Sequence, residues 1–202
     1  MKLRDITLFA LLLIIADQAL KIWIKTNMRI GEAIYVAGEW FQLRFLENNG
    51  AAFGMQLGDG AGFDWGKLLL SGFRICMIAA LTYYVVKLVR KGDTPKGVFI
   101  ALTMILAGAI GNIIDSAFYG LIFSKSTYYT VAEFGGYYAP MMMGKVVDMF
   151  YFPMFQWNNA PQFLQFLLDS NNYFFGAIFN LADSYISVAV VYLMIFQRKF
   201  FE

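Results

Sequence analysis

Residues 98–115 read VFIALTMILAGAIGNIID, and this stretch decides the fold class. It carries no charged side chain before its last residue. Its length is close to the roughly 20 residues that an α-helix needs to cross a hydrocarbon layer of about 30 Å. Backbone groups inside a bilayer must be hydrogen-bonded within the protein, so the stretch is predicted to be a transmembrane helix. Three other apolar stretches are comparable, and together they predict spans at about 6–25, 68–89, 97–115 and 177–197.

The composition of the whole chain agrees with a membrane protein. The chain has 202 residues, of which 59% are hydrophobic and 15% charged, against roughly 45–50% and about 25% in soluble domains. Its length fits one domain over residues 1–202. The net charge of +2 and the lack of a basic cluster exclude a nucleic-acid-binding protein.

The missing residue types exclude several chemistries. The chain contains no His, which rules out Ser/His/Asp and Cys/His catalysis and any imidazole-bearing metal site. Its one Cys, Cys76, lies inside an apolar run and cannot form an internal disulfide or a multi-cysteine metal site. Acid–base chemistry in this chain therefore has to use Asp, Glu, Lys or Tyr.

Lys and Arg residues predict the orientation. They lie before the first predicted span, in the short connection near residues 87–96, and after the last span. By the positive-inside rule both termini and this connection are cytoplasmic, and segments 26–66 and 116–176 lie outside. The bias is incomplete, because other basic residues such as Arg44 and Lys145 lie on the outer side.

The outer segments carry weaker structural signals. Residues 40–45 (WFQLRF) alternate apolar and polar side chains, which predicts a strand, and residues 32–37 are its expected hairpin partner. Pro161–Leu168 predicts a short helix lying at the membrane interface. The predicted fold is a mainly α, four-transmembrane-helix bundle with a small extracytoplasmic β-sheet and this short interfacial helix.

Each predicted span carries polar side chains in its outer half. These are Asp17 and Lys21 in the first, Arg74 in the second, Asn112 and Asp115 in the third, and Asn180 and Asp183 in the fourth. Ionisable residues within membrane helices are costly and rare. Their common depth predicts one polar site between the helices, near the outer surface.

Simpler roles exist for several of these residues. Asp17 and Lys21 are four residues apart, so they can pair and only neutralise each other. Asn112 and Asn180 can join helices through hydrogen bonds without forming a site. Arg74 can snorkel or pair with an acid.

The acids point to a specific chemistry. Asp115 and Asp183 each follow an Asn by three residues, and Asp148 lies where the chain returns to the membrane. Taken alone, Asp148 is an ordinary loop or cap acid. Carboxyl groups brought together in a poorly hydrated place cannot all ionise, so one keeps a proton while its partner stays charged. Such a pair can activate water and protonate a leaving amine, as in aspartic proteases.

Five motifs in order resemble those of the lipoprotein signal peptidase (signal peptidase II) family. They are Asp17-Gln18-x-x-Lys21, Asn48-Asn49-Gly50-Ala51-Ala52-Phe53, Gly111-Asn112-x-x-Asp115, Val146-Val147-Asp148 and Phe179-Asn180-x-Ala182-Asp183.

The resemblance implies a membrane aspartic endopeptidase with no metal or organic cofactor. Its substrates are bacterial prolipoproteins, cut just before a diacylglyceryl-modified cysteine. The implied catalytic pair is Asp148 and Asp183. The implied supporting, substrate-contacting or pair-orienting residues are Asp17, Lys21, Asn48, Gly50, Asn112, Asp115, Asn180 and Ala182. The resemblance further implies a monomer that contacts membrane lipid in the bacterial inner membrane, with its site toward the periplasm and a small sheet that cradles the substrate.

One departure and two alternative functions remain at this level. The family usually has Arg directly after the Asp of the third motif, where this chain has Ser116; Arg44, Arg74 or Lys145 are candidates to replace that cation. A small transporter or channel subunit could use the same acids, although its site is expected near the midplane and in repeated halves. A non-catalytic lipid-binding or assembly factor is the other alternative.

Overall fold

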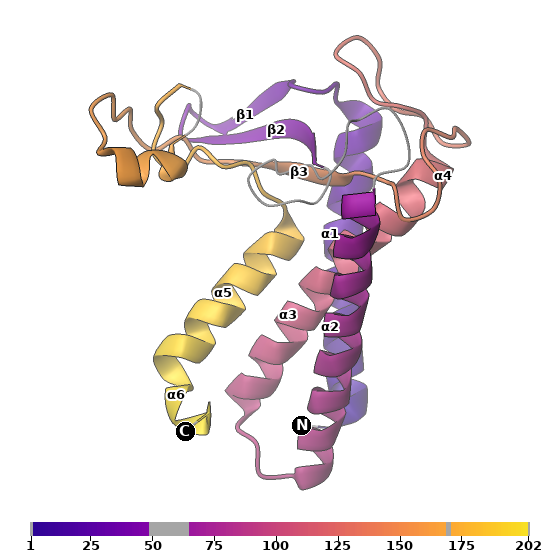
Figure 1. Ribbon diagram of the computed structural model, residues 1–202, viewed down its shortest axis with the longest axis vertical. Coiled ribbons are helices and arrows are strands. Elements are labelled where there is room, and N and C mark those ends of the chain that lie inside the picture. The colour runs from indigo at the N-terminus through magenta and orange to yellow at the C-terminus, as the bar shows by residue number, and fades with distance from the viewer. Residues whose placement is uncertain (1, 49–64, 169–170, 202) are drawn as a thin grey trace.

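The computed structural model describes residues 2–48, 65–168 and 171–201, and its helices stand beneath a small sheet (Figure 1). The longer helices are α1 (Leu3–Asn27), α2 (Trp65–Lys91), α3 (Lys96–Ile114) and α5 (Leu181–Phe196). A π-helical turn (Asp115–Tyr119) and α4 (Gly120–Ile122) extend α3, and α6 (Arg198–Phe201) follows α5. Both termini and the α2–α3 connection lie at the end of the bundle opposite the sheet.

Among the described residues, three helices are long and apolar enough to cross a membrane: Leu3–Asn27, Trp65–Lys91 and Lys96–Ile122. Large apolar side chains on their outer faces are exposed, including Leu12 at 66% and Leu69 at 70%, which suits lipid contact. The fourth predicted span differs, because α5 has only 16 residues.

The late start of α5 is caused by a contact with a distant strand. Instead of continuing a helix, Phe179 exchanges two backbone hydrogen bonds with Phe150, at 2.7 and 3.1 Å. Asn180 then caps the helix, with its side chain accepting from the Asp183 N–H. Residues 177–180 were predicted to belong to the span, but Phe179 pairs with β3 and Asn180 caps the helix.

Helix α3 packs against α1, α2 and α5, and glycines permit its closest approaches. A Cβ on Gly108 would lie 2.4 Å from the Ala182 carbonyl oxygen, and one on Gly111 would lie 2.7 Å from Asp17 Oδ2. Small residues allow membrane helices to pack closely in this way. The crossing brings α1, α3 and α5 together just below the sheet.

We expect Gly108→Ala to lower the free energy of unfolding by about 1–3 kcal/mol, because the methyl group would push α5 away from α3. Gly72→Ala is the matched control, since a Cβ there meets no atom within 4 Å. It should be neutral or stabilise by about 0.5–1 kcal/mol, because Ala favours a helix. Thermal unfolding of both variants in one detergent measures the difference. Equal effects of the two changes would contradict the close crossing.

The sheet has the antiparallel order β1 (Ala33–Ala37), β2 (Phe41–Asn48), β3 (Val146–Tyr151). The predicted hairpin of β1 and β2 is confirmed. The alternation suggested that residues 41, 43 and 45 share a face, but the register shifts between Leu43 and Leu46. This irregularity accompanies the burial of Phe45, which packs with Ile24 and Val147.

The alternation rule missed β3 as a strand. Val146, Val147, Asp148, Met149 and Tyr151 are all buried, so the strand shows no alternation of exposed and buried side chains. The segment predicted as a helix at Pro161–Leu168 contains instead a 3₁₀ helix, Gln162–Leu167. It lies beside the sheet layer, away from the bundle (Figure 1).

Candidate active site

Polar side chains from α1, β2, α3, β3 and α5 meet where the bundle reaches the sheet. The structure places these predicted site residues in one hydrogen-bonded group: Asp17, Lys21, Asn48, Asn112, Asp115, Asp148, Asn180, Ala182 and Asp183. The predicted Gly50 lies outside the described residues.

Asp148 and Asp183 act on each other electrostatically from different elements. Asp148, on β3, is 2% exposed and accepts hydrogen bonds from the side chains of Asn48 and Asn180, the latter at 2.7 Å. Asp183, in the first turn of α5, is half-buried and accepts from Asn112 Nδ2 at 2.8 Å. Three asparagine amides thus orient the two carboxyl groups.

Asn180 connects the two acids through the start of α5. Its Oδ1 accepts from the Asp183 N–H at 2.9 Å, and its own N–H donates to Asp183 Oδ2 at 3.3 Å. This reciprocal capping box fixes Asp183 in the first helical turn, where the helix dipole favours a negative charge. The remaining Nδ2 group of Asn180 donates to Asp148.

A buried ammonium group lies beneath this pair. Lys21 Nζ donates to Asp17 Oδ2 at 3.0 Å, Asp115 Oδ2 at 2.8 Å and Asn112 Oδ1 at 2.8 Å. These bonds use all three donors of the ammonium. The predicted pairing of Asp17 with Lys21 is confirmed, and Asp115 belongs to the same ion cluster.

The Lys21 cluster also sets the orientation of Asn112. Because the Asn112 oxygen accepts from Lys21, its Nδ2 group is directed to Asp183. Asp17 Oδ1 accepts from the Ala182 N–H at 2.9 Å, and Asp115 Oδ2 accepts from the Val147 N–H at 3.3 Å. The cluster therefore contacts the residue immediately before each of Asp148 and Asp183.

Sequence reasoning assigned no role to Gln18 and Tyr119. Gln18 Nε2 lies 3.1 Å from Asp17 Oδ2 and 2.9 Å from Asp115 Oδ1, and the Tyr119 hydroxyl donates to Gln18 Oε1 at 3.1 Å. Gln18 is three residues before Lys21, so helical spacing could have placed both against Asp115. No local signal pointed to Tyr119.

The three candidate substitutes for the missing arginine differ in position. Arg74 is half-buried and interacts electrostatically with the site acids, first with Asp183. Arg44 lies over the Tyr151 ring, 5.3 Å from its centroid. Lys145 lies 3.6 Å from a Glu47 oxygen. Arg74 is therefore the candidate that acts on the acids.

Burial raises the pKa of Asp148 to about 7, and the negative charge of Asp183 adds to this effect. Hydrogen bonds from Asn180 and Asn48 oppose the rise, because they stabilise the charged form. Asp148 can therefore hold a proton near neutral pH, as one member of an acid–base pair requires. Within the described ranges, no group of three or more His, Cys, Asp and Glu is arranged to hold a metal ion.

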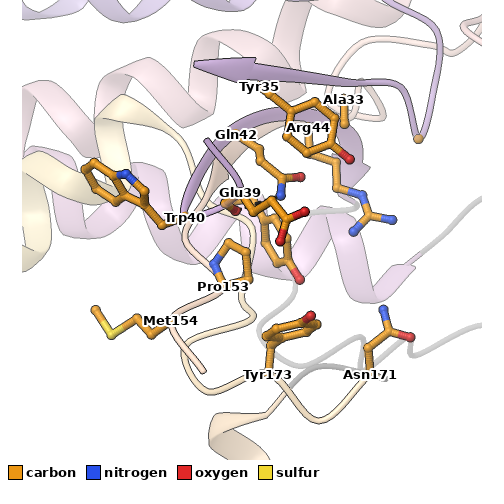
Figure 2. A pocket seen from close by; sticks show the side chains of 12 residues that line it. Ala33, Tyr35, Glu39, Trp40, Gln42, Arg44, Pro153, Met154, Asn171 and Tyr173 are labelled. Carbon is orange, nitrogen blue, oxygen red and sulfur yellow. Dashed lines mark hydrogen bonds between the residues drawn. The ribbon is translucent and has the colours of Figure 1, made fainter. Parts of the chain in front are cut away.

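A separate cavity of about 590 Å³ lies against the sheet (Figure 2). Tyr35, Gln42, Arg44 and Tyr151 line it, together with residues that follow β3. Side chains alternate between the faces of a strand, so Tyr151 and Asp148, three positions apart, lie on opposite faces of β3. The cavity is therefore distinct from the site of the acids.

Comparison with known proteins identifies the family. The family described as Signal peptidase (SPase) II matches residues 9–199, nearly the whole chain. The chain belongs to the signal peptidase II family. It is thus an aspartic peptidase that removes signal peptides from prolipoproteins, and an integral membrane protein of bacteria. This function replaces the transporter and the binding factor considered from sequence.

Similar sequences agree with membership of the signal peptidase II family, and a solved structure shares the fold. A lipoprotein signal peptidase of Porphyromonas gingivalis is 44% identical over 186 residues, covering 91% of this chain and 78% of the relative. One from Amoebophilus asiaticus is 33% identical over 195 residues, with coverages of 94% and 75%. A solved bacterial membrane enzyme shares the fold, with a TM-score of 0.64 and 23% identity over 98% of this chain and 89% of that one.

Proposed function

We propose that Asp148 and Asp183 are the catalytic pair and that they cleave the prolipoprotein just before its lipidated cysteine. The observation that carries the proposal is their shared partner Asn180, which bonds both acids at the junction of sheet and bundle. Cleavage of a purified diacylglyceryl-modified prolipoprotein, followed by mass measurement of both products, tests the cut position. A cut on the other side of the cysteine, or no cut, would refute it.

The surroundings of the two carboxyl groups suggest different roles. Asp183 is half-buried in the first turn of α5 and accepts a hydrogen bond from Asn112, and it is assigned the role of general base. Asp148 is deeply buried, which favours its protonated form. Asp183 then takes a proton from water as the water oxygen attacks the amide carbonyl. Asp148 gives its proton to the leaving nitrogen as the C–N bond breaks.

The Lys21 cluster is assigned a supporting role in this scheme. Its ammonium pairs with the carboxylates of Asp17 and Asp115, which lie buried beside the proposed catalytic pair. Through Asn112 it also holds Asp183 in place. Arg74 supplies further positive charge near Asp183, whereas Ser116, at the position where the family usually has Arg, carries no charge.

We expect activity to fall as pH rises through about 7. Asp148 has a raised pKa of about 7, so its protonated form is present below this pH and is lost above it. Because only protonated Asp148 can donate the proton, kcat/KM is expected to decline roughly tenfold per pH unit well above the pKa. A fluorogenic lipopeptide assayed between pH 5 and 9, with folding checked at each pH, measures this limb. A flat profile from pH 6 to 9 would contradict the role of Asp148.

The membrane arrangement is also part of the proposal. We place both termini and the α2–α3 connection in the cytoplasm and the site toward the periplasm of the inner membrane. The shared end of these segments and their Lys and Arg residues support this orientation. Helix α5 is about 24 Å long at 1.5 Å per residue and serves, with α6, as the fourth span. Labelling single cysteines from each side of the membrane tests this topology.

Contact with membrane lipid and action as a monomer complete the proposal. The 3₁₀ segment Gln162–Leu167 extends sideways from the sheet and is placed at the membrane surface. Deletion of 161–168 should weaken membrane association or activity; no change in either would remove this assignment. Mass measurement of the purified enzyme in detergent tests the monomer.

A further inference from the structure

A second buried charge cluster lies one helical turn beyond Lys21. Lys25, fully buried at the end of α1, forms an ion pair with Glu47 of β2, whose side chain is 2% exposed. Ser126 Oγ accepts from Lys25 Nζ at 3.0 Å and donates to Glu47 Oε1 at 3.0 Å. The proposed catalytic steps use none of these groups.

The cluster is enclosed by the loop that follows α4. Lys25 Nζ lies 5.5 Å from the ring centroid of Phe123 and 4.9 Å from that of Tyr138, within cation–π range. The Tyr138 hydroxyl accepts from the Lys145 N–H at 2.8 Å, and Lys145 Nζ lies 3.6 Å from Glu47 Oε2. The cluster therefore joins α1, β2 and the loop leading into β3.

Stability alone is a poor explanation for this arrangement. Removing two charges from water is costly, and a buried ion pair is often no more stabilising than a well-packed apolar pair. A buried pair can nevertheless select one arrangement of the chain over others. In this protein the pair is therefore expected to fix the position of β2.

Glu47 is well placed to control that position. It lies opposite Val147, and the next residue, Asn48, lies opposite Val146 at the end of the β2–β3 ladder. The register is irregular just before this end, between Leu43 and Leu46. A slip of one residue would move Asn48 to the other face of the sheet. Its hydrogen bond to Asp148 would then be lost.

We propose that the Lys25–Glu47 ion pair is a positioning element that holds the end of β2 in register with β3, so that Asn48 donates to Asp148. The inference rests on the proposed catalytic role of Asp148. It assigns a purpose to a charge cluster outside the catalytic group. Neither Lys25 nor Glu47 touches the reacting atoms.

The test combines Lys25→Met with Glu47→Leu, which replaces the ion pair by an apolar pair. We expect the melting temperature to stay near that of the parent, while kcat falls about 10–100-fold from misplacement of Asn48 and KM changes little. The basic limb of the pH profile should move to higher pH, because the Asn48 hydrogen bond lowers the pKa of Asp148. The control is Lys91→Met with Asp93→Leu, an ion pair whose side chains are 66% and 62% exposed.

A double-mutant cycle shows whether the pair acts through Asn48. Adding Asn48→Ala to the Met/Leu variant should cause little further loss, since the hydrogen bond is already gone. The proposal would be overturned if the losses of kcat from Asn48→Ala and from the Met/Leu variant multiplied in the combined variant. A parent-like kcat and pH profile in the Met/Leu variant would also overturn it. If that variant does not fold, Glu47→Gln replaces it. The expected loss of kcat is smaller and should disappear in the Asn48→Ala background. A parent-like kcat and pH profile of Glu47→Gln would overturn the proposal equally. Full activity of Asp148→Asn would instead refute the catalytic assignment.

Discussion

Replacing either Asp148 or Asp183 by Asn is expected to lower kcat/KM by at least about 10³-fold, because the pair must both accept and donate a proton. Asn has nearly the same shape as Asp but cannot ionise or act as a carboxylic acid. In Asp148→Asn the amide oxygen can still accept hydrogen bonds from Asn180 and Asn48, so the fold should persist. Cleavage of a lipidated prolipoprotein, followed by mass spectrometry, measures the loss.

Asp93→Asn is the control for this prediction. Asp93 lies in the α2–α3 connection with its side chain 62% exposed, and its partner is Lys91. Its replacement should leave kcat/KM unchanged. Processing at the parent rate by either Asp148→Asn or Asp183→Asn, in folded protein, would refute the catalytic pair.

Lys21→Met is expected to lower the free energy of unfolding by about 3–5 kcal/mol, the usual effect of removing one partner from a buried ion pair. Asp17 and Asp115 would remain buried without their cation, and Asn112 would lose the donor that orients it. In a chain of this size, the melting temperature should fall by roughly 6–20 °C. Thermal unfolding followed by intrinsic fluorescence in detergent measures the change.

Two further variants separate this effect from a general loss of positive charge. Lys91→Met removes an exposed partner and should cost no more than about 1 kcal/mol. Adding Asp17→Asn and Asp115→Asn to Lys21→Met removes the unpaired charges and should recover part of the stability. If Lys21→Met and Lys91→Met lowered the free energy of unfolding equally, the buried cluster would contribute no more to stability than an exposed ion pair.

The two lysine clusters on α1 support different acids of the proposed pair. Lys21 and Lys25 are one turn apart, and both are fully buried. Lys21 bonds Asn112, which orients Asp183, whereas Lys25 pairs with Glu47, beside the residue that bonds Asp148. Each acid of the proposed catalytic pair is therefore linked to α1 through one lysine and one asparagine.

Much of the architecture was readable from local sequence. The apolar runs located α1, α2 and α3 to within a few residues, and the spacing of Asp17 and Lys21 predicted their ion pair. These features follow from how each segment meets lipid or its own helix face, and neighbouring residues are enough to reveal them.

Tertiary contacts decided the rest, because partners distant in the chain outweighed local preference. Helix α5 starts at Leu181 since Phe179 pairs with Phe150, although residues 177–180 looked like part of a span. Asp148 is a buried strand residue bonded to Asn180, and hydropathy alone could not separate it from an ordinary loop acid. The acceptors that Lys21 binds depend on how α1 and α3 cross. The sequence of either helix alone does not show which residues of the other it will contact.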